Sequence, residues 1–450
     1  MLRNGAPSAN VTHAMLAVAR TLGHPGASAS VTMDQLTLSE IDTEANRSLS
    51  ISHSVGASGF NLAAISAVEA ATKAVIRGDL GVEEGLDELD RIERTRLRHH
   101  ALLQLVGWGV MAAGFAVLLG AGWFTVLLAG TVGLLIEAVS ALLAKVEMPA
   151  PFIHVVSGAM ATGAAILAVA TTPGQSAAVI VTAALVSKLA GGSALGAAQD
   201  ILTGWYLTAS ARVIEAMLVT GGLVVGIIGT LALASRFGDA MTLGGDPHVS
   251  SGLLPLIGGS VLVAGGFAAA SQAPWSRIPV ICVLAAGSNV IAQGVRSLGF
   301  SEITSVVVAA SVLGAVAVLG TRWIKLPPSG VLGVALAPLL PGMQIYLGFV
   351  ALTDGAQAVP HFALAALLAM ALGSGIVLGE YVSSQVLWRG MQVRNAAQQR
   401  MSGEDALEAR ELTAEWLSTP LFRRPFLVEE FQRPDDDQLG REPERVSSTS

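Results

Sequence analysis

The chain has 450 residues, of which 52% are hydrophobic and only 13% are charged, with a formal net charge of −7. Soluble domains carry about 25% charged residues, so this composition excludes an ordinary soluble protein, and the acidic balance argues weakly against nucleic-acid binding. A single cysteine, Cys282, excludes a disulfide within the chain. The charges crowd into the first hundred residues and the segment after Arg389, a distribution typical of a polytopic membrane protein with polar ends.

The first hundred residues are predicted to form a small α/β cytosolic domain. The hydrophobic pattern is helical over 10–22, alternates like a strand over 31–38 and more weakly over 47–53, and is helical again over 60–76 and 82–92. No metal-spaced His/Cys cluster and no phosphate loop occur in this part of the sequence. The chain does not open with a basic segment followed by an apolar run, so we expect no cleaved signal peptide.

Ten apolar stretches of membrane length follow. About 20 apolar residues cross a bilayer, and roughly 17 to 25 are tolerated. The first five stretches are 101–120, 122–144, 150–171, 175–188 and 207–234, and the second five are 253–270, 278–293, 303–320, 330–351 and 361–386. They predict a polytopic α-helical membrane protein with about ten transmembrane helices.

The lysines and arginines of the short loops indicate the orientation. With the N-terminus inside, most of them lie on the cytoplasmic side, Lys188 among them as a loop residue, and only Arg236 and Arg296 fall outside. This bias predicts that both termini are cytoplasmic. The predicted domains are 1–100, 101–236, 237–388 and a cytosolic tail, 389–450. Within the tail, 395–417 is expected to form a charged helix and the end from Arg423 to be disordered.

Two sets of five stretches suggest an internal duplication. Gly191-Gly192, after the fourth stretch, corresponds to Pro341-Gly342 in the ninth. Gly222-x-x-x-Gly226 in the fifth corresponds to Gly375-x-x-x-Gly379 in the tenth, at nearly the same offset. Because five is odd, the halves must have opposite orientations in the membrane, which is the inverted-repeat plan of many secondary transporters.

The approach to the fifth stretch carries polar residues that suit a free amino acid. Thr208, Arg212 and Glu215 share one helix face, and Asp200 and Thr203 precede them. An amino-acid zwitterion needs an anion for its ammonium and a cation or helix N-terminus for its carboxylate, and a side-chain hydroxyl needs a further partner. Ionisable groups in membrane helices are functional by default. The alternative is an i, i+3 ion pair between Arg212 and Glu215, with Asp200 as a helix cap.

Three other features are candidates for the transport path. Pro341-Gly342 should break the ninth helix, because proline removes a hydrogen-bond donor, and Gln344 would then face the cavity; a simple kink is the alternative. Glu137, deep in the second stretch, is the preferred proton-relay carboxyl, since a dry site lets a carboxyl keep its proton. Glu380 is assigned to the inner membrane interface.

The order Gln199-Asp200-x-x-Thr203-Gly204, then Thr208, then Ala211-Arg212-x-x-Glu215-Ala216 resembles the most recognisable motif of the threonine/serine exporter family. Gly59-Phe60-Asn61-Leu62 and Pro338-Leu339-Leu340-Pro341-Gly342 are similar to two further family segments, and the resemblance covers most of 10–388. Members usually carry an additional helix before the point where this chain begins. The resemblance implies a bacterial plasma-membrane exporter of threonine and serine, driven by the proton gradient, with no cofactor besides the proton as coupling ion.

We therefore predict a secondary exporter of small amino acids, not an enzyme, that works by alternating access between two inverted halves. Its expected partners are the small-molecule substrate, the lipid bilayer and, as an open alternative, further copies of the chain. Export of other small metabolites or dipeptides is one alternative function, and a channel or sensor gated by the cytosolic domain is another. An intramembrane enzyme is disfavoured because the sequence contains neither HExxH nor GxSxG.

Overall fold

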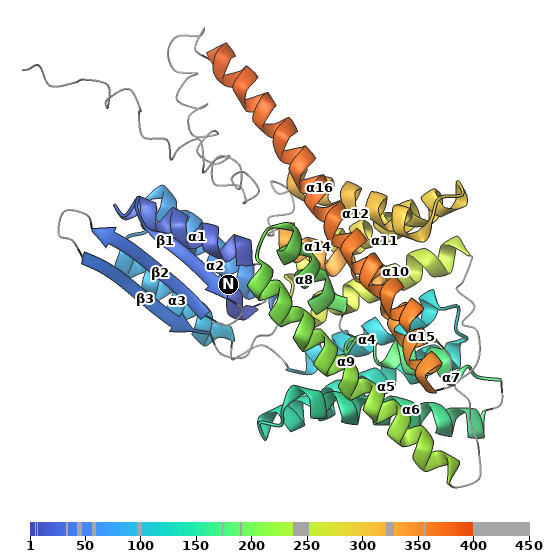
Figure 1. Cartoon of the computed structure of the whole chain (residues 1–450). Coiled ribbons are helices and arrows are strands. Elements are labelled where there is room, and N and C mark those ends of the chain that lie inside the picture. The colour runs from blue at the N-terminus through green and yellow to red at the C-terminus, as the bar shows by residue number, and fades with distance from the viewer. Residues whose placement is uncertain are drawn as a thin grey trace, which may run out of the picture. The chain divides into compact units, whose positions relative to one another are not determined.

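The computed structural model of the chain describes residues 1–4, 6, 8–32, 35–42, 47–55, 60–96, 101–172, 174–189, 191–236, 252–320, 328–353 and 357–398 (Figure 1). The chain divides into two units, Met1–Ser383 and Ser384–Ser450. The second unit contributes only the end of helix α16 (Val359–Gln398) to the described residues. The predicted tail helix from residue 399 onward and the predicted disordered end lie outside them.

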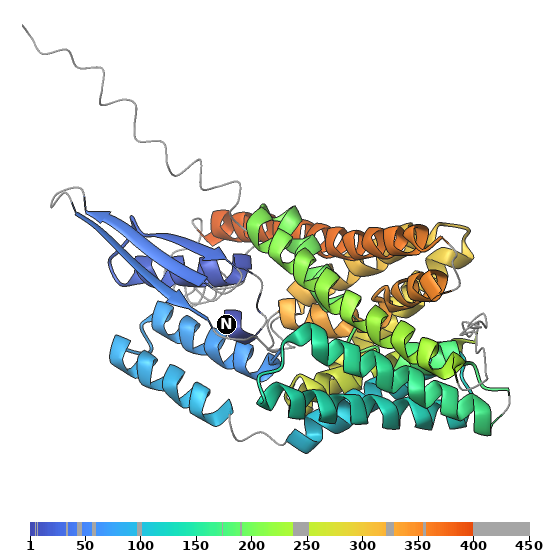
Figure 2. The same cartoon turned by 60° about the horizontal axis from the view of Figure 1, so that its bottom comes forward.

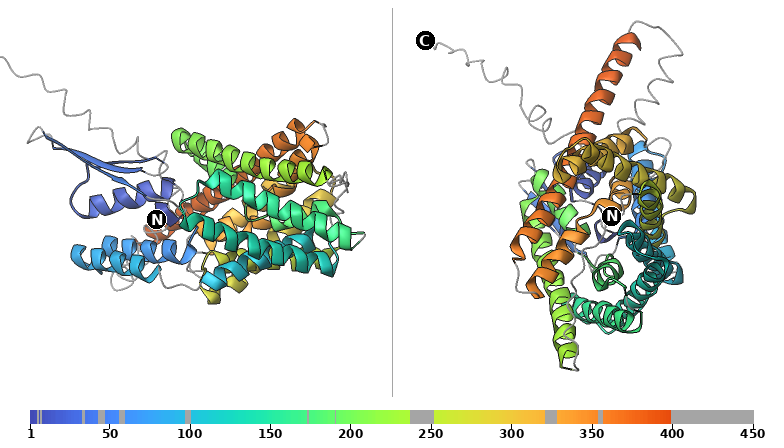
Figure 3. Two further views of the ribbon diagram at one scale, coloured as in Figure 1. Left: turned by 90° about the horizontal axis from the view of Figure 1, so that it is seen from below. Right: turned by 90° about the vertical axis from the view of Figure 1, so that its right-hand side faces the viewer.

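The N-terminal region combines helices with a three-stranded antiparallel sheet of order β1-β2-β3. Helix α1 lies against the sheet on the side of β1 (Figure 2, Figure 3), and α2 and α3 lie where helices are predicted. The elements are the 3-10 helix η1 (Leu2–Asn4), α1 (Ser8–Thr21), β1 (Ser28–Thr32), β2 (Gln35–Asp42), β3 (Arg47–Ser54), α2 (Leu62–Arg77) and α3 (Val82–Arg96).

The single strand predicted over 31–38 is wrong, because the chain reverses within that stretch. Thr32 of β1 lies opposite Gln35 of β2, and Val31 lies opposite Leu36. The alternation of apolar and polar residues continues through both arms of a hairpin, since each arm has the same period of two. The pattern alone therefore did not mark the turn.

Seven of the described helices are long and apolar enough to cross a membrane. An eighth, α4 (Ala101–Leu118), contains an apolar segment, Leu102–Leu118, that is slightly shorter than these seven. The seven are α5 (Trp123–Lys145), α6 (Ala150–Thr171), α9 (Tyr206–Ser235), α10 (Leu253–Ala270), α11 (Ile278–Ser297) with the 3-10 helix η2 (Trp275–Arg277) before it, α12 (Glu302–Leu319) and α16. Each of these eight helices coincides with one of the ten predicted stretches.

The fourth and ninth predicted stretches are broken helices. The fourth consists of α7 (Ala177–Ala184) and α8 (Gly191–Leu202), and the ninth of α14 (Pro328–Ala335), the 3-10 helix η3 (Ala337–Leu339) and α15 (Gly342–Thr353). Both breaks separate a helix of 8 residues from one of 12 residues. The predicted end of the fourth stretch at 188 is wrong, because Lys188 and the glycines after it look like a loop in a hydropathy window although the helix resumes at Gly191.

Glycines allow α4 and α10 to pack closely. A Cβ built on Gly107 of α4 would lie 2.7 Å from the carbonyl oxygen of Gly266 of α10, and one built on Gly259 of α10 would lie 3.0 Å from that of Gly114 of α4. Larger side chains would force the backbones apart, which is why small residues mark close helix contacts in membranes.

The glycine motifs predicted in the fifth and tenth stretches make the same kind of contact. Gly222 and Gly226 of α9 pack against the backbone of α6, along which α9 runs (Figure 2). Gly375 and Gly379 of α16 pack against the backbone of α12. Gly229, the third glycine on the face of α9, meets open space, so the close contact ends at Gly226.

The N-terminal region contacts the membrane-length helices at two places. Where α2 begins, the backbone N–H of Leu62 donates to the carbonyl oxygen of Ser271 at 2.9 Å, and Asn61 Nδ2 donates to Gln272 Oε1 at 2.6 Å, both just after α10. At the second place Trp205, just before α9, packs against the small core made by Leu2, Ala6, Val11, Val31 and Ile65.

Replacing Gly266 with alanine should destabilise the helix bundle, because the new methyl group would lie 2.6 Å from the carbonyl oxygen of Gly107. Overpacking of this kind costs about 1–3 kcal/mol. Gly258 in the same helix has no neighbour within 4 Å of a built Cβ, so Gly258→Ala is the matched control and should leave stability unchanged or slightly higher. Thermal unfolding midpoints of the purified variants in detergent measure both effects. Equal midpoints for the two variants would contradict the close α4–α10 contact.

Candidate functional site

The turn between α8 and α9 brings Asp200 and Arg212 together. Asp200 lies near the end of α8 and its side chain is 1% exposed, while the Arg212 side chain on α9 is 19% exposed. Arg212 Nη1 lies 3.0 Å from Asp200 Oδ2, but that oxygen has no partner with hydrogen-bond geometry among the described residues. The pair is therefore held by charge, and the carboxylate keeps a free acceptor position.

Local backbone chemistry explains why α9 returns toward α8. Gly204 has a φ of 85°, a left-handed conformation that glycine adopts without strain and that commonly ends helices. The N–H of Trp205 then donates to the carbonyl oxygen of Asp200 at 2.7 Å, which closes the end of α8. The Arg212 side chain crosses α8 at Gly196, where a Cβ would lie 2.5 Å from Nη1. A glycine one turn before Asp200 thus leaves room for the guanidinium.

The other polar residues predicted around this pair are only partly assembled. The Thr203 hydroxyl donates to the carbonyl oxygen of Gln199 at 2.9 Å within its own helix end, and Gln199 itself is half-buried. Thr208 is buried and its hydroxyl donates to the carbonyl oxygen of Val31 in β1 at 3.4 Å. Glu215 is exposed. The alternative in which Arg212 pairs with Glu215 is wrong, because the turn at Gly204 presents Asp200 to the guanidinium instead.

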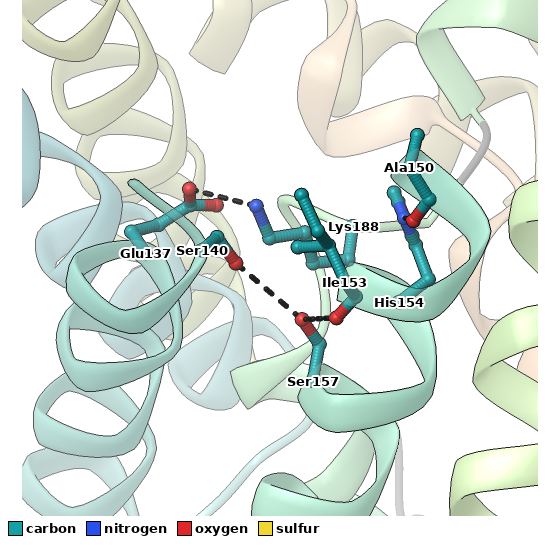
Figure 4. A network of polar contacts seen from close by, with 7 residues as sticks. All are labelled: Glu137, Ser140, Ala150, Ile153, His154, Ser157 and Lys188. Atoms are coloured by element: carbon teal, nitrogen blue, oxygen red, sulfur yellow. Dashed lines mark hydrogen bonds and ion pairs between the residues drawn. The ribbon is translucent and has the colours of Figure 1, made fainter. Parts of the chain in front are cut away.

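A second ion pair lies at the break between α7 and α8. Lys188 Nζ, in the turns that separate the two helices, donates to Glu137 Oε2 of α5 at 2.8 Å (Figure 4). The two side chains are only 13% and 12% exposed. Lys188 was predicted to lie in a cytoplasmic loop and was not predicted as a site residue. The available signal was its position just before Gly191-Gly192, the counterpart of the break in the ninth stretch.

Hydroxyl groups and a histidine surround this second pair (Figure 4). Ser140, one turn after Glu137 on α5, lies 3.5 Å from Ser157 of α6, oxygen to oxygen, and the Ser157 hydroxyl contacts its own helix at the Ile153 carbonyl, 2.8 Å away. His154 Nδ1 lies 2.8 Å from the carbonyl oxygen of Ala150. Since a carbonyl only accepts, Nδ1 carries the proton, and Nε2 of the neutral ring is an acceptor.

The helix break predicted at Pro341-Gly342 is present, and it touches the first break. Both residues are buried and α15 begins at Gly342. A Cβ on Gly342 would lie 2.8 Å from Leu189 Cδ1, next to Lys188. Gln344, in the first turn of α15, is half-buried.

Glu380, predicted to lie at the inner membrane interface, is buried against neighbouring helices. Its side chain in α16 is 5% exposed. The reason is the close approach of α12: a Cβ on Gly314 of α12 would lie 2.8 Å from the carbonyl oxygen of Ile376, one turn before Glu380. Sequence position near the end of a stretch does not reveal which neighbour covers a side chain.

The described residues contain seven membrane-length apolar helices and two broken helices, α7–α8 and α14–α15. Buried ion pairs lie at the break between α7 and α8 and near the end of α8. These features define a membrane transport protein. A family model described as threonine/serine exporter matches residues 1–234, and a second, described as Threonine/Serine exporter, ThrE, matches residues 257–382. The chain therefore belongs to the threonine/serine exporter family, whose members are transporters and not enzymes, and it is a multi-pass protein of the bacterial membrane.

Two curated relatives carry the same family name. The chain is 29% identical to the Threonine/serine exporter of Corynebacterium glutamicum over 401 residues, which cover 86% of this chain and 81% of that protein. It is 26% identical to a protein of Mycobacterium tuberculosis named Probable threonine/serine exporter, over 396 residues that cover 85% of this chain and 74% of that protein. No solved structure matches the chain.

Replacing Asp200 with asparagine leaves the Arg212 guanidinium without its anion in a mostly buried position. Removing one partner of a buried ion pair costs about 3–5 kcal/mol, so Asp200→Asn should lower the thermal unfolding midpoint. Asp200→Asn combined with Arg212→Gln should recover much of that loss, because no unpaired charge remains. A double variant no more stable than Asp200→Asn would show that the two residues do not act as a pair.

Proposed function

We propose that this protein exports threonine and serine from the bacterial cytoplasm, driven by the proton gradient. The observation that carries the proposal is the pair of buried ionic contacts on the broken helix α7–α8, within helices otherwise apolar enough for a membrane. Charges are costly there and mark substrate or ion pathways. The names of the two relatives support the choice of threonine and serine as substrates.

We infer that the membrane part consists of two inverted halves, 101–236 and 237–388, that alternate access. If each of the two broken helices crosses the membrane once, they make ten crossings together with α4 and the seven membrane-length helices. Both termini are then on the cytoplasmic side. The matched lengths of α7, α8, α14 and α15 support the repeat. So do the glycine contacts of α9 on α6 and of α16 on α12.

The contact between α4 and α10 supports the same arrangement. Gly107 meets Gly266, and Gly114 meets Gly259. Gly107 and Gly114 are spaced as Gly259 and Gly266 are, so each helix presents the same pair of positions to the other in opposite order. A two-fold axis between the first helices of two inverted repeats generates this reciprocity.

The polar residues then take roles in binding or coupling. Asp200 and Arg212 form a separable charge pair at the end of α8, flanked by Gln199 and Thr203, and Glu215 extends the face of α9 toward solvent. Thr208 positions this face through its contact with β1. Glu137 and the break at Pro341-Gly342 with Gln344 belong to the central part of the path, and the proton is the coupling ion.

The contacts between the N-terminal region and the membrane-length helices favour a second candidate, a channel or sensor gated from the cytosol. Thr208 binds β1 and Asn61 binds Gln272, so a movement of the N-terminal region would act directly on α9 and α10. Saturable, proton-dependent flux separates a carrier from such a channel, and competition by other solutes tests dipeptides and small metabolites as substrates.

Threonine efflux from cells preloaded with a threonine dipeptide tests the proposal. Cells with this protein should release threonine faster than cells without it, and an uncoupler should abolish the difference. Asp200→Asn should slow efflux by about tenfold or more, equivalent to roughly 1.4 kcal/mol. Glu302→Gln, which removes a half-buried carboxylate that pairs with Arg296 at the start of α12, is the matched control and should behave like the parent protein. Efflux equal to that of empty cells, with the protein present in the membrane, would reject threonine as substrate.

A further inference from the structure

The Glu137–Lys188 pair is unusual for its position. Glu137 is the one acidic residue in α5, a helix of 23 residues apolar enough to cross a membrane. Both side chains are nearly nine-tenths buried. Taking two charges out of water costs several kcal/mol per ion before their attraction is counted. An apolar pair would fill this space at lower cost, so the position indicates a use for the charges.

The surroundings of Lys188 differ from those of a side chain inside a regular helix. It lies in the turns between Ala184, where α7 ends, and Gly191, where α8 begins. Its neighbour Leu189 contacts Gly342, where α15 begins. The first N–H groups of a helix have no intrahelical partner, and helix N-termini favour negative charge. The twelve-residue helix α8 thus begins three residues after Lys188, and the twelve-residue helix α15 begins beside Leu189.

Two hydroxyl groups complete the polar surface. Ser140 is on the same face of α5 as Glu137, because residues three apart share a face, and it lies opposite Ser157 of α6 (Figure 4). The contact of 3.5 Å between their oxygens is at the limit of a hydrogen bond, so Ser140 can accept a better partner. Ile136, next to Glu137 in α5, and Leu185, whose carbonyl oxygen accepts from the Lys188 N–H at 2.8 Å, are both fully buried in one apolar cluster.

We propose that this is the binding site for the zwitterionic head of the substrate, a small hydroxylated amino acid. The substrate ammonium replaces Lys188 on the Glu137 carboxylate, and the substrate carboxylate binds the Lys188 ammonium. Ser140 and Ser157 bind the side-chain hydroxyl, and Ile136 and Leu185 limit the size of the side chain. The assignment rests on the proposed function, because it names the site where the exported amino acid binds.

Charge balance explains the direct contact between Glu137 and Lys188. When the substrate leaves, Glu137 and Lys188 neutralise each other at 2.8 Å, so neither charge remains unpaired in a mostly buried position. When it binds, each protein charge meets an opposite charge on the substrate. Both states are therefore neutral, and the cost of an uncompensated buried charge is avoided in each.

The assignment is tested with the purified full-length protein by measuring the dissociation constant of each substrate analogue and dividing it by that of L-threonine. L-Threonine methyl ester lacks the carboxylate and N-acetyl-L-threonine lacks the ammonium. Each should bind the parent protein about 10- to 100-fold more weakly than L-threonine, as expected for loss of a hydrogen bond to a charged group. Lys188→Met should weaken threonine binding, because it removes the partner of the substrate carboxylate. The dissociation constant of the methyl ester should then be close to that of threonine. Glu137→Gln removes the partner of the substrate ammonium, so the dissociation constant of N-acetyl-L-threonine should then be close to that of threonine.

The hydroxyl contact and the controls use the same assay. L-2-Aminobutyrate lacks the hydroxyl of threonine, and Ser140→Ala should reduce the preference for threonine over it. Lys145→Met, at the exposed end of α5, should leave all ratios unchanged. If either single variant fails to fold, Glu137→Gln combined with Lys188→Met removes both charges and should bring both ratios close to one.

The possible results separate the two proposals. Folded variants that keep the parent ratios, in a protein that binds threonine, would overturn the assignment and leave the proposed function intact. A parent protein that binds neither threonine nor serine would overturn the proposed substrate and the site with it.

Discussion

The half-helix α8 is held at both ends by buried ion pairs, and the other features of the candidate site depend on them. Glu137–Lys188 lies just before its first residue, and Asp200–Arg212 lies near its last turn. In an apolar environment a charge is tolerated only beside an opposite charge, so each pair fixes its neighbouring helix, α5 or α9, relative to α8. The proposed binding of substrate at Glu137–Lys188 meets the same constraint, because a ligand with matching charges would leave neither charge unpaired.

Close helix contacts through glycine join three pairs of helices. α4 meets α10, α9 meets α6 and α16 meets α12 with backbone against backbone, and such contacts leave little freedom to bend or shift. The broken helices differ, since their two segments are joined by turns and not by a continuous hydrogen-bond ladder. These breaks, at α7–α8 and α14–α15, lie beside Lys188 and at the Pro341-Gly342 turn, which is where the proposed alternating access would require movement.

The N-terminal region contacts the turn between α8 and α9. Trp205 packs into its small core and Thr208 bonds to β1, and both lie between Asp200 and Arg212 in sequence. Asn61 and Leu62 bond to the residues that follow α10. A change at the turn between α8 and α9 would therefore act on β1 through Thr208, whereas the start of α2 is bonded to the residues after α10.

Features that depend on local composition and period could be predicted from the amino-acid sequence. The positions of eight apolar helices, the glycine motifs of α9 and α16 and the break at Pro341-Gly342 all follow from residues close together in the chain. Tertiary structure decided which partners the charges have. Arg212 meets Asp200 and not Glu215, Glu137 meets Lys188, Thr208 meets β1, and Glu380 is covered by α12. These contacts join residues from different helices, whose faces meet only after packing, and no local pattern specifies which face that will be.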